Sequence, residues 1–244
     1  MPAQGVAATA PTTRRNAAPA AREVMVMGFC AEQLERHASL WRRMLEHPFL
    51  IATRDGTIAR ETFTCWMRQD VLFVEAAIPF IAALIPKAPR AHWQPLAGVI
   101  TALEKELELF EGRARAVGVE LRGVPPSFVN HAYIQFLMAT ALRAGYAEAF
   151  TVLYTAEKAY HESWKVVQAG LDPASPWQLF VENWAGSAFA DYVSWLEGEL
   201  DRLAAGAGEE ERGRMAELFA LTVRYEIAFW QMASTGEGWP GLED

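Results

Sequence analysis

The sequence contains few cysteines: among its 244 residues there are two, Cys30 and Cys65. Neither belongs to a CxxC pair or to a Cys/His set with zinc-ligand spacing, which excludes a disulfide framework and a structural zinc motif. A chain with so few thiols suits a reducing compartment, so we expect a cytoplasmic protein.

Basic charge and long hydrophobic runs are also scarce. The chain has 22 Lys and Arg against 30 Asp and Glu, a net charge of -8, so it lacks the positive field that holds a phosphate backbone. The most apolar stretch, residues 71–85, is interrupted by Glu75 and Pro79 and falls short of the roughly 20 residues of a membrane helix. We therefore expect a buried helix there, and neither nucleic acid nor a membrane as a partner.

Residues 1–22 contain no acid and are rich in alanine, threonine, proline and arginine. Transit peptides and disordered leaders share this composition, whereas a secretion signal has a continuous hydrophobic segment. We expect a disordered leader over residues 1–22 and one helical domain over residues 23–244.

Beyond the leader, apolar residues recur at spacings of three and four, the period of an α-helix. The expected helices cover residues 30–46, 60–85, 93–117, 128–143, 147–168, 177–184, 188–204 and 209–234. Short Gly and Pro breaks separate them, and no segment alternates with period two for long enough to form a strand. The sequence predicts an all-α, single-domain helical bundle of about seven to eight long helices.

What the sequence has in quantity is aromatic residues, with 9 Trp and 13 Phe, and several acids embedded in apolar helix faces. The segments of interest carry Asp70 with Phe73, Tyr133, Glu157 with Tyr160, and Glu226. A buried carboxylate is costly unless it is paired or hydrogen-bonded, so such acids mark candidate sites. Carboxylates, phenols and aromatic walls together predict a polar-floored pocket for a flat heteroaromatic ligand.

Each of these residues also has a purely structural interpretation. A buried acid in a helical bundle is commonly paired with an arginine, such as Arg68 or Arg224, and a buried tyrosine commonly belongs to the core. The acids Glu104, Glu106, Glu108 and Glu111 are most simply a solvated helix face.

A metal site is a further alternative, because Glu157 and His161 stand four residues apart and could chelate one ion. Di-iron bundles use ExxH motifs on paired helices, and this sequence has no second such motif. We therefore expect no metal and no cofactor.

The order of these segments resembles the TenA/thiaminase II family, a branch of the haem-oxygenase-like helical fold that also includes PqqC-type oxidases. The resemblance spans residues 47–239, and each of its pieces is short. They are HPF and DGT within residues 47–57, RQD ending at Asp70, the segment from Tyr225 to Trp230 with Met232, and the final pair Gly238 and Trp239.

The resemblance implies roles for individual residues. The family's pyrimidine-binding Asp falls on Asp70, its helix tyrosines on Tyr133 and Tyr160, and its acid/base Glu on Glu226. The nucleophilic Cys of the family falls on Ala156, which cannot attack a ring. A family Tyr is replaced by Phe73, and another pocket Tyr falls near Ala188.

A second branch of the family lacks the Cys and uses glutamate, and this chain resembles it because Glu157 adjoins the lost position. The resemblance implies hydrolysis of aminomethyl- or formylaminomethyl-pyrimidine to hydroxymethyl-pyrimidine in thiamin salvage, with Glu226 and Glu157 sharing the acid and base roles. It also implies a small pyrimidine as the ligand and a homodimer or homotetramer. Two alternatives stay open: a non-catalytic pyrimidine-binding or regulatory protein, and a PqqC-like or di-metal oxidase.

Overall fold

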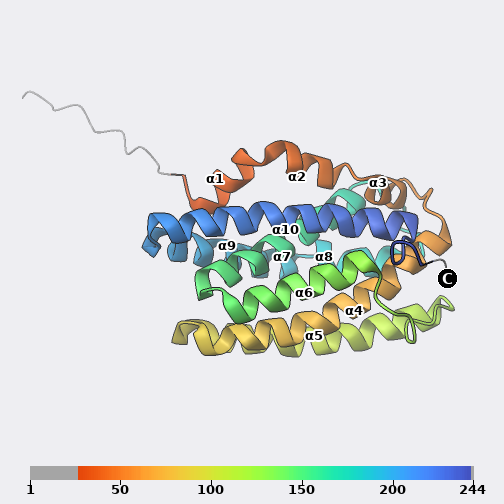
Figure 1. The fold of residues 1–244 in the computed structure, drawn as a ribbon. Coiled ribbons are helices and arrows are strands. Elements are labelled where there is room, and N and C mark those ends of the chain that lie inside the picture. Colours follow the sequence, from red (N-terminus) through yellow and green to blue (C-terminus); the bar gives the residue numbers. More distant parts are fainter. Residues whose placement is uncertain (1–26, 243–244) are drawn as a thin grey trace, which may run out of the picture.

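The computed structural model describes residues 27–242, so the expected leader over residues 1–22 and its boundary lie outside the described residues. The described chain forms ten α-helices and one 3-10 turn, without a strand (Figure 1). The elements are α1 (Phe29–Arg36), α2 (Ala38–Leu45), α3 (Pro48–Arg54), α4 (Arg60–Leu84), η1 (Ile85–Lys87), α5 (Arg90–Ala116), α6 (Phe128–Arg143), α7 (Tyr146–Gln168), α8 (Gln178–Ala185), α9 (Ser187–Gly206) and α10 (Glu209–Thr235). The expected all-α bundle is confirmed.

The expectation of one helix over residues 30–46 is wrong, because the helix is broken at His37. This residue has φ -109° and ψ 22°, outside helical values, although its carbonyl still accepts a hydrogen bond from the amide of Trp41. Its ring stacks on Phe219 of α10, with ring centroids 6.0 Å apart. The break therefore involves a single residue that is packed against the last helix.

The HPF segment begins a helix that the periodicity did not predict. The amide of Phe49 donates to Nδ1 of His47, which caps α3, and Pro48 occupies the first helical turn, where a missing N–H costs nothing. Seven residues are too few for a periodic pattern to be recognised, so capping is the signal that identifies this helix.

The bundle is organised around α7. Helix α10 packs lengthwise on α7 and also contacts α4, while α8 and α9 pack on other parts of α7 (Figure 1). Helix α4 in turn contacts α5 and α6. Segments far apart in the sequence, α4, α7 and α10, are thereby brought against one another in the middle of the molecule.

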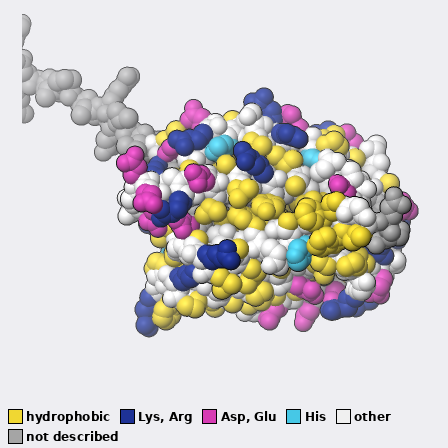
Figure 2. All heavy atoms as spheres, viewed as in Figure 1, with side chains coloured by type: hydrophobic (Ala, Val, Ile, Leu, Met, Phe, Trp, Pro, Cys, Tyr) yellow, Lys and Arg dark blue, Asp and Glu magenta, His cyan; other side chains and the backbone are white. Residues whose placement is uncertain are grey.

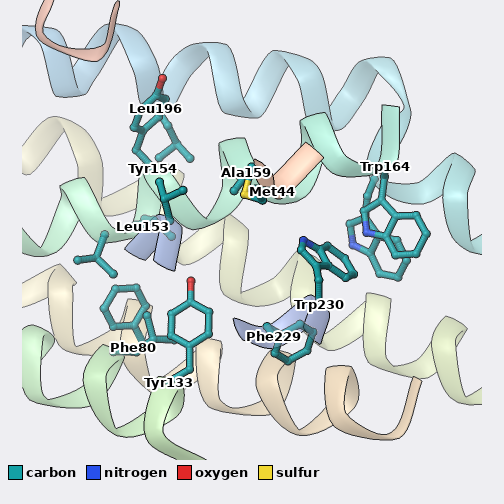
Figure 3. Packing of buried hydrophobic residues seen from close by; sticks show 14 of the residues in the cluster. Met44, Phe80, Tyr133, Leu153, Tyr154, Ala159, Trp164, Leu196, Phe229 and Trp230 are labelled. Atoms are coloured by element: carbon teal, nitrogen blue, oxygen red, sulfur yellow. The ribbon is translucent and has the colours of Figure 1, made fainter. Parts of the chain in front are cut away.

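Large aromatic side chains fill the interior between these helices. Trp230 lies between Phe229 and Trp164, with ring centroids 5.9 and 5.8 Å away (Figure 3). Trp164 is fully buried and Trp41 nearly so, and both belong to the core. Much of the aromatic surplus of the sequence therefore stabilises the fold by burial.

Helix α4 with η1 (Arg60–Lys87) is long and apolar enough to cross a membrane by length and composition, with a mean hydropathy of 1.6 over its best window. The core helix of a soluble protein meets the same criterion. Here α4 packs against α5, α6 and α10.

On the face shown in Figure 2, hydrophobic side chains form a central band, with acidic and basic side chains interspersed around it.

Candidate active site

Six of the long helices and the short α8 enclose one internal cavity at the centre of the bundle. Its walls are formed by Asp70, Phe73, Val74, Ala77 and Phe80 of α4, Leu103 and Glu106 of α5, Leu137 of α6, Leu153, Ala156, Glu157 and Tyr160 of α7, Trp184 of α8, Phe189 of α9 and Glu226 of α10. Four of these residues are acids, and no lysine or arginine lines this cavity. Five of the six residues predicted for the site, all but Tyr133, line it.

Asp70 is buried on α4, with 1% of its surface exposed. Its Oδ1 accepts a hydrogen bond from the hydroxyl of Tyr160 at 2.6 Å, whereas its buried Oδ2 has no partner among residues 27–242. Burial raises the pKa of Asp70 well above its ordinary value, against the opposing effect of the Tyr160 hydrogen bond. An unpaired buried carboxyl oxygen on a cavity wall is the group that a ligand N–H would satisfy.

Glu226 is buried on α10 and faces the same cavity. Its Oε1 accepts a hydrogen bond from the hydroxyl of Tyr133 at 2.6 Å. Burial raises the pKa of Glu226 to about 8, and the Tyr133 hydrogen bond acts in the opposite direction. Tyr133 does not line the cavity. Its role at the site is to orient the carboxyl group of Glu226 through this hydrogen bond.

Glu157 of α7 is half-buried and lines the cavity next to Ala156. The hydroxyl of Tyr192 donates to its Oε1 over 3.5 Å, a weaker bond than that between Tyr133 and Glu226. Burial, aided by the nearby carboxyls of Glu106 and Glu226, raises the pKa of Glu157 to about 8. The cavity thus holds two coupled carboxyls that titrate near neutral pH.

Aromatic rings form the walls around these acids. Phe73 lies 4.8 Å from the ring of Tyr133 and 5.7 Å from that of Phe229, measured between centroids. The ring of Tyr160 stacks on Trp230, with centroids 5.7 Å apart and planes within 10°. These flat surfaces suit a heteroaromatic ligand.

The expectation that Glu106 belongs to a solvated face is wrong. Its Oε1 accepts a hydrogen bond from Nε1 of Trp184 at 2.7 Å, and burial raises the pKa of the carboxyl. Residues two apart on a helix point about 200° away from each other, so Glu106 faces inward while Glu104 and Glu108 face solvent. The even spacing of these acids was the signal that could have separated Glu106 from its neighbours.

The arginine-paired interpretation of the buried acids does not hold. None of the ion pairs among the described residues includes Asp70, Glu157 or Glu226. Arg68, one of the two suggested partners, donates instead to the backbone carbonyl of Glu120.

The pair formed by Glu157 and His161 does not converge on one point of the cavity. Nδ1 of His161 lies 2.7 Å from the backbone oxygen of Trp184, and His161 is absent from the cavity wall. Within residues 27–242, no group of three His, Cys, Asp or Glu side chains is arranged to hold a metal ion.

Tyr192 is the second site residue that the sequence analysis missed. It lies on α9, and its hydroxyl donates a hydrogen bond to Glu157 of α7. A tyrosine one helical turn beyond Ala188 was visible in the sequence, but its contact with α7 depends on how the two helices pack.

Fold and site together define a haem-oxygenase-like helical protein with an acid-lined internal cavity. The chain belongs to the TENA/THI-4/PQQC family, whose sequence profile matches residues 34–236. Among solved structures, a TenA homologue from Pyrococcus furiosus is 37% identical with a TM-score of 0.81, covering 84% of this chain and 99% of that one. A domain of unknown function with a heme oxygenase-like fold from Shewanella denitrificans superposes with a TM-score of 0.69 at 12% identity, covering 86% of this chain and 92% of that one.

Two relatives by sequence carry functional names. A protein from Glycine max named "Probable bifunctional TENA-E protein" is 28% identical over 85% of this chain and 93% of its own length. A protein from Halalkalibacterium halodurans named "Aminopyrimidine aminohydrolase" is 24% identical over 87% of this chain and 98% of its own length.

Proposed function

We propose that this protein is an aminopyrimidine aminohydrolase, which hydrolyses aminomethyl- or formylaminomethyl-pyrimidine to hydroxymethyl-pyrimidine. The observation that carries the proposal is the single cavity shared by Asp70, with its unpaired Oδ2, and by Glu157 and Glu226, whose pKa values are raised to about 8. The similarity to the Halalkalibacterium halodurans aminohydrolase supports the same reaction.

Asp70 is the recognition group for the pyrimidine. A ring nitrogen and the adjacent exocyclic amine of an aminopyrimidine present two hydrogen-bonding atoms side by side, which match the two oxygens of one carboxyl. The raised pKa of Asp70 favours its protonated form, which donates to the ring nitrogen and accepts from the amine. Phe73 and Tyr160 then face the flat ring.

Glu226 and Glu157 divide the proton transfers between them. Glu226 loses its proton first, because its short hydrogen bond from Tyr133 favours the ionised form, and Glu157 stays protonated beside that charge. Glu226 removes a proton from a water molecule while the oxygen of that water bonds to the methylene carbon of the substrate. Glu157 gives its proton to the nitrogen as the carbon–nitrogen bond breaks, so ammonia or formamide leaves.

A carboxylate mechanism fits the residue that replaces the family nucleophile. Ala156 lines the cavity directly beside Glu157, and its methyl group offers no lone pair for attack. The free thiols, Cys30 and Cys65, are both absent from the cavity wall. The absence of a thiol from this wall supports assignment to the branch that lacks the Cys.

The direct test supplies both pyrimidines to the purified protein, with Glu226→Gln as the comparison. Hydroxymethyl-pyrimidine released by the wild type and not by Glu226→Gln supports the proposal. Thermal stabilisation by either pyrimidine without any turnover would instead favour the non-catalytic binding protein.

We also propose a cytoplasmic homodimer or homotetramer. Both cysteines are free, as a reducing compartment would keep them. The assembly is the one that the family resemblance implies. Light scattering of the purified protein tests the assembly, and a monomeric mass would contradict it.

A further inference from the structure

A groove lies on the surface between α2 and α10, with a volume of about 810 Å³. We name it the α2–α10 groove. It is lined by Ser39, Leu40, Arg42 and Arg43 of α2, Glu46, His47 and Pro48 at the junction of α2 and α3, and Arg224, Ile227, Ala228 and Gln231 of α10. Its volume lies within the range of small-molecule sites, about 300 to 1,000 Å³.

The groove concentrates positive charge on a chain whose net charge is -8. None of the ion pairs among residues 27–242 includes Arg42, Arg43 or Arg224. Glu46 is the single acid of the lining, so three guanidinium groups and one carboxylate leave an excess of two positive charges. On the face shown in Figure 2, basic side chains gather along the upper edge, over α2.

Helical spacing places the arginines on facing walls. Arg42 and Arg43 follow Ser39 by about one turn of α2, and Gln231 follows Arg224 by about two turns of α10. Because α2 packs against α10, these two stripes face each other across the groove. Guanidinium groups from two helices can therefore contact different oxygens of one bound anion.

Uncharged donors add to the arginines. Nδ1 of the buried His47 accepts a hydrogen bond from the amide of Phe49, so the neutral ring carries its proton on Nε2. Nε2 donates to Oε1 of Gln231 at 3.3 Å, which leaves the amide nitrogen of Gln231 as a donor for a ligand. Desolvation lowers the pKa of His47, and the charge of Arg43 acts in the same direction. The positive charge of the groove therefore belongs to the arginines, which stay charged at every physiological pH.

Apolar side chains occupy the space between the arginines. They are Leu40 of α2, Pro48 of α3, and Ile227 and Ala228 of α10. Guanidinium planes also stack on flat aromatic groups. The groove therefore offers one set of contacts to a phosphate and another to a flat organic group attached to it.

Helix α10 separates the groove from the acid-lined cavity. Glu226 faces the cavity, whereas Arg224 and Ala228, each two residues away from it, line the groove. Residues two apart on a helix point about 200° away from each other, so the two spaces lie on opposite faces of α10. The cavity wall contains no lysine or arginine, so an anion finds its cationic partners in the groove.

We propose that the α2–α10 groove binds a phosphate monoester of a small organic molecule. Such a phosphate carries about 1.5 to 2 negative charges near pH 7, which matches the excess of positive charge in the groove. Its oxygens accept hydrogen bonds from the arginines, and its organic part contacts the apolar residues between them. Residues 1–22 contain no acid, so that segment of the chain does not supply the anion. The inference goes beyond the proposed reaction and does not depend on it.

Calorimetric titration of the purified full-length protein at low ionic strength tests the proposal with three probes. Phenyl phosphate carries both a phosphate and a flat ring, inorganic phosphate lacks the ring, and phenol lacks the phosphate. We expect phenyl phosphate to bind most tightly, inorganic phosphate more weakly, and phenol not measurably. The Kd of phenyl phosphate should increase as sodium chloride is added, since salt screens contacts between exposed charges.

Four variants test which residues bind the phosphate. Arg43→Gln and Arg224→Gln remove one cation from each wall, and each should raise the Kd of phenyl phosphate about tenfold. Glu46→Gln removes the opposing carboxylate and should lower that Kd about two- to fivefold. Arg143→Gln is the matched control, because Arg143 is exposed on α6 and lies outside the groove, and it should leave the Kd unchanged. Circular dichroism and melting curves establish that all four variants fold.

Several outcomes would overturn the inference. They are a wild type that does not bind phenyl phosphate, inorganic phosphate that binds as tightly as phenyl phosphate, or an equal increase of Kd in Arg143→Gln and Arg224→Gln. A change in oligomer mass confined to the variants of the groove would assign this surface to contact between copies of the chain, and would also overturn it. None of these measurements involves turnover, so the aminohydrolase proposal can fail while this one holds, and the reverse.

Discussion

The hydroxyl of Tyr133 on α6 donates a hydrogen bond to Oε1 of Glu226 on α10 at 2.6 Å, and both side chains are buried. This contact joins two residues that are 93 positions apart in the chain, and it sets the ionisation of the carboxyl to which we assign the role of base. A hydrogen bond to the charged form of an acid lowers its pKa. Tyr133 therefore keeps Glu226 available as a base closer to neutral pH.

Tyr133→Phe removes this hydrogen bond and leaves the ring in place. We expect the pKa of Glu226 to rise, so that the acid limb of the pH–rate profile moves to higher pH and kcat/KM at pH 7 falls about tenfold. Tyr154→Phe is the matched control, because Tyr154 is also buried but donates to Glu197, away from the cavity. An equal displacement of the limb in both variants would contradict the assignment.

Glu226→Gln and Glu157→Gln should each lower kcat by about 100- to 10,000-fold, the usual range for loss of a general acid or base. Residual activity should differ in its pH dependence, since Glu226→Gln removes the acid limb and Glu157→Gln the alkaline limb. Full pH–rate profiles of both variants test this division, and loss of the same limb in both would reverse or remove it.

Asp70→Ala should act on binding more than on chemistry. A methyl group can neither donate a hydrogen bond to the ring nitrogen nor accept one from the adjacent amine, so we expect KM to rise roughly 10- to 100-fold. The change in kcat should be smaller. Steady-state kinetics on aminomethyl-pyrimidine separates the two constants, and an unchanged KM would exclude Asp70 as the recognition group.

Folding stability should decrease as pH rises toward 8. Burial raises the pKa of Glu226 from 4.5 in a free carboxyl to about 8, so the folded state holds a proton that the unfolded chain releases above pH 4.5. The stabilisation is complete below pH 4.5 and is lost progressively up to about pH 8. Glu226→Gln should therefore melt with a weaker pH dependence between pH 5 and 8 than the wild type, and calorimetric scans at several pH values measure this.

The wild-type enzyme should resist thiol alkylation. Burial raises the pKa of both Cys30 and Cys65, and neither lines the cavity, so iodoacetamide should leave the activity unchanged. Ala156→Cys introduces a thiol into the cavity wall and should become sensitive to the reagent. Inactivation of the wild type would contradict a mechanism based on carboxylates alone.

The long helices could be predicted from the sequence because their apolar spacing persists over many turns. The end of α6 at Arg143 and that of α7 at Gln168 agree with the expected ends. The break at His37 was not predictable in the same way, because apolar spacing continues through it and its cause is packing against Phe219 of α10. The spacing of apolar residues predicts where long helices form, whereas the position of a break such as that at His37 depends on contacts with other helices.

The site was predictable to the extent that its residues stand out locally. Asp70 and Glu226 were evident as acids within apolar segments. Their partners, Tyr160 for Asp70 and Tyr133 for Glu226, became identifiable as partners only when α4, α6, α7 and α10 were brought together. Glu106 was overlooked because the acids on both sides of it are solvated, although its spacing of two residues from each turns it to the opposite side of the helix, where it accepts the hydrogen bond from Trp184.

The four acids around the cavity also affect how the protein would respond to selection for stability. An apolar side chain at any of these four positions would pack without the desolvation cost of a carboxyl group. Asp70 Oδ2 also lacks a hydrogen-bond donor within the described chain. Selection for melting temperature alone would therefore replace these acids first, with leucine or methionine at Asp70 and Glu226. Variants recovered in that way would melt at higher temperature and would be inactive. The positions substituted by thermal selection would therefore locate this site without any assay of activity.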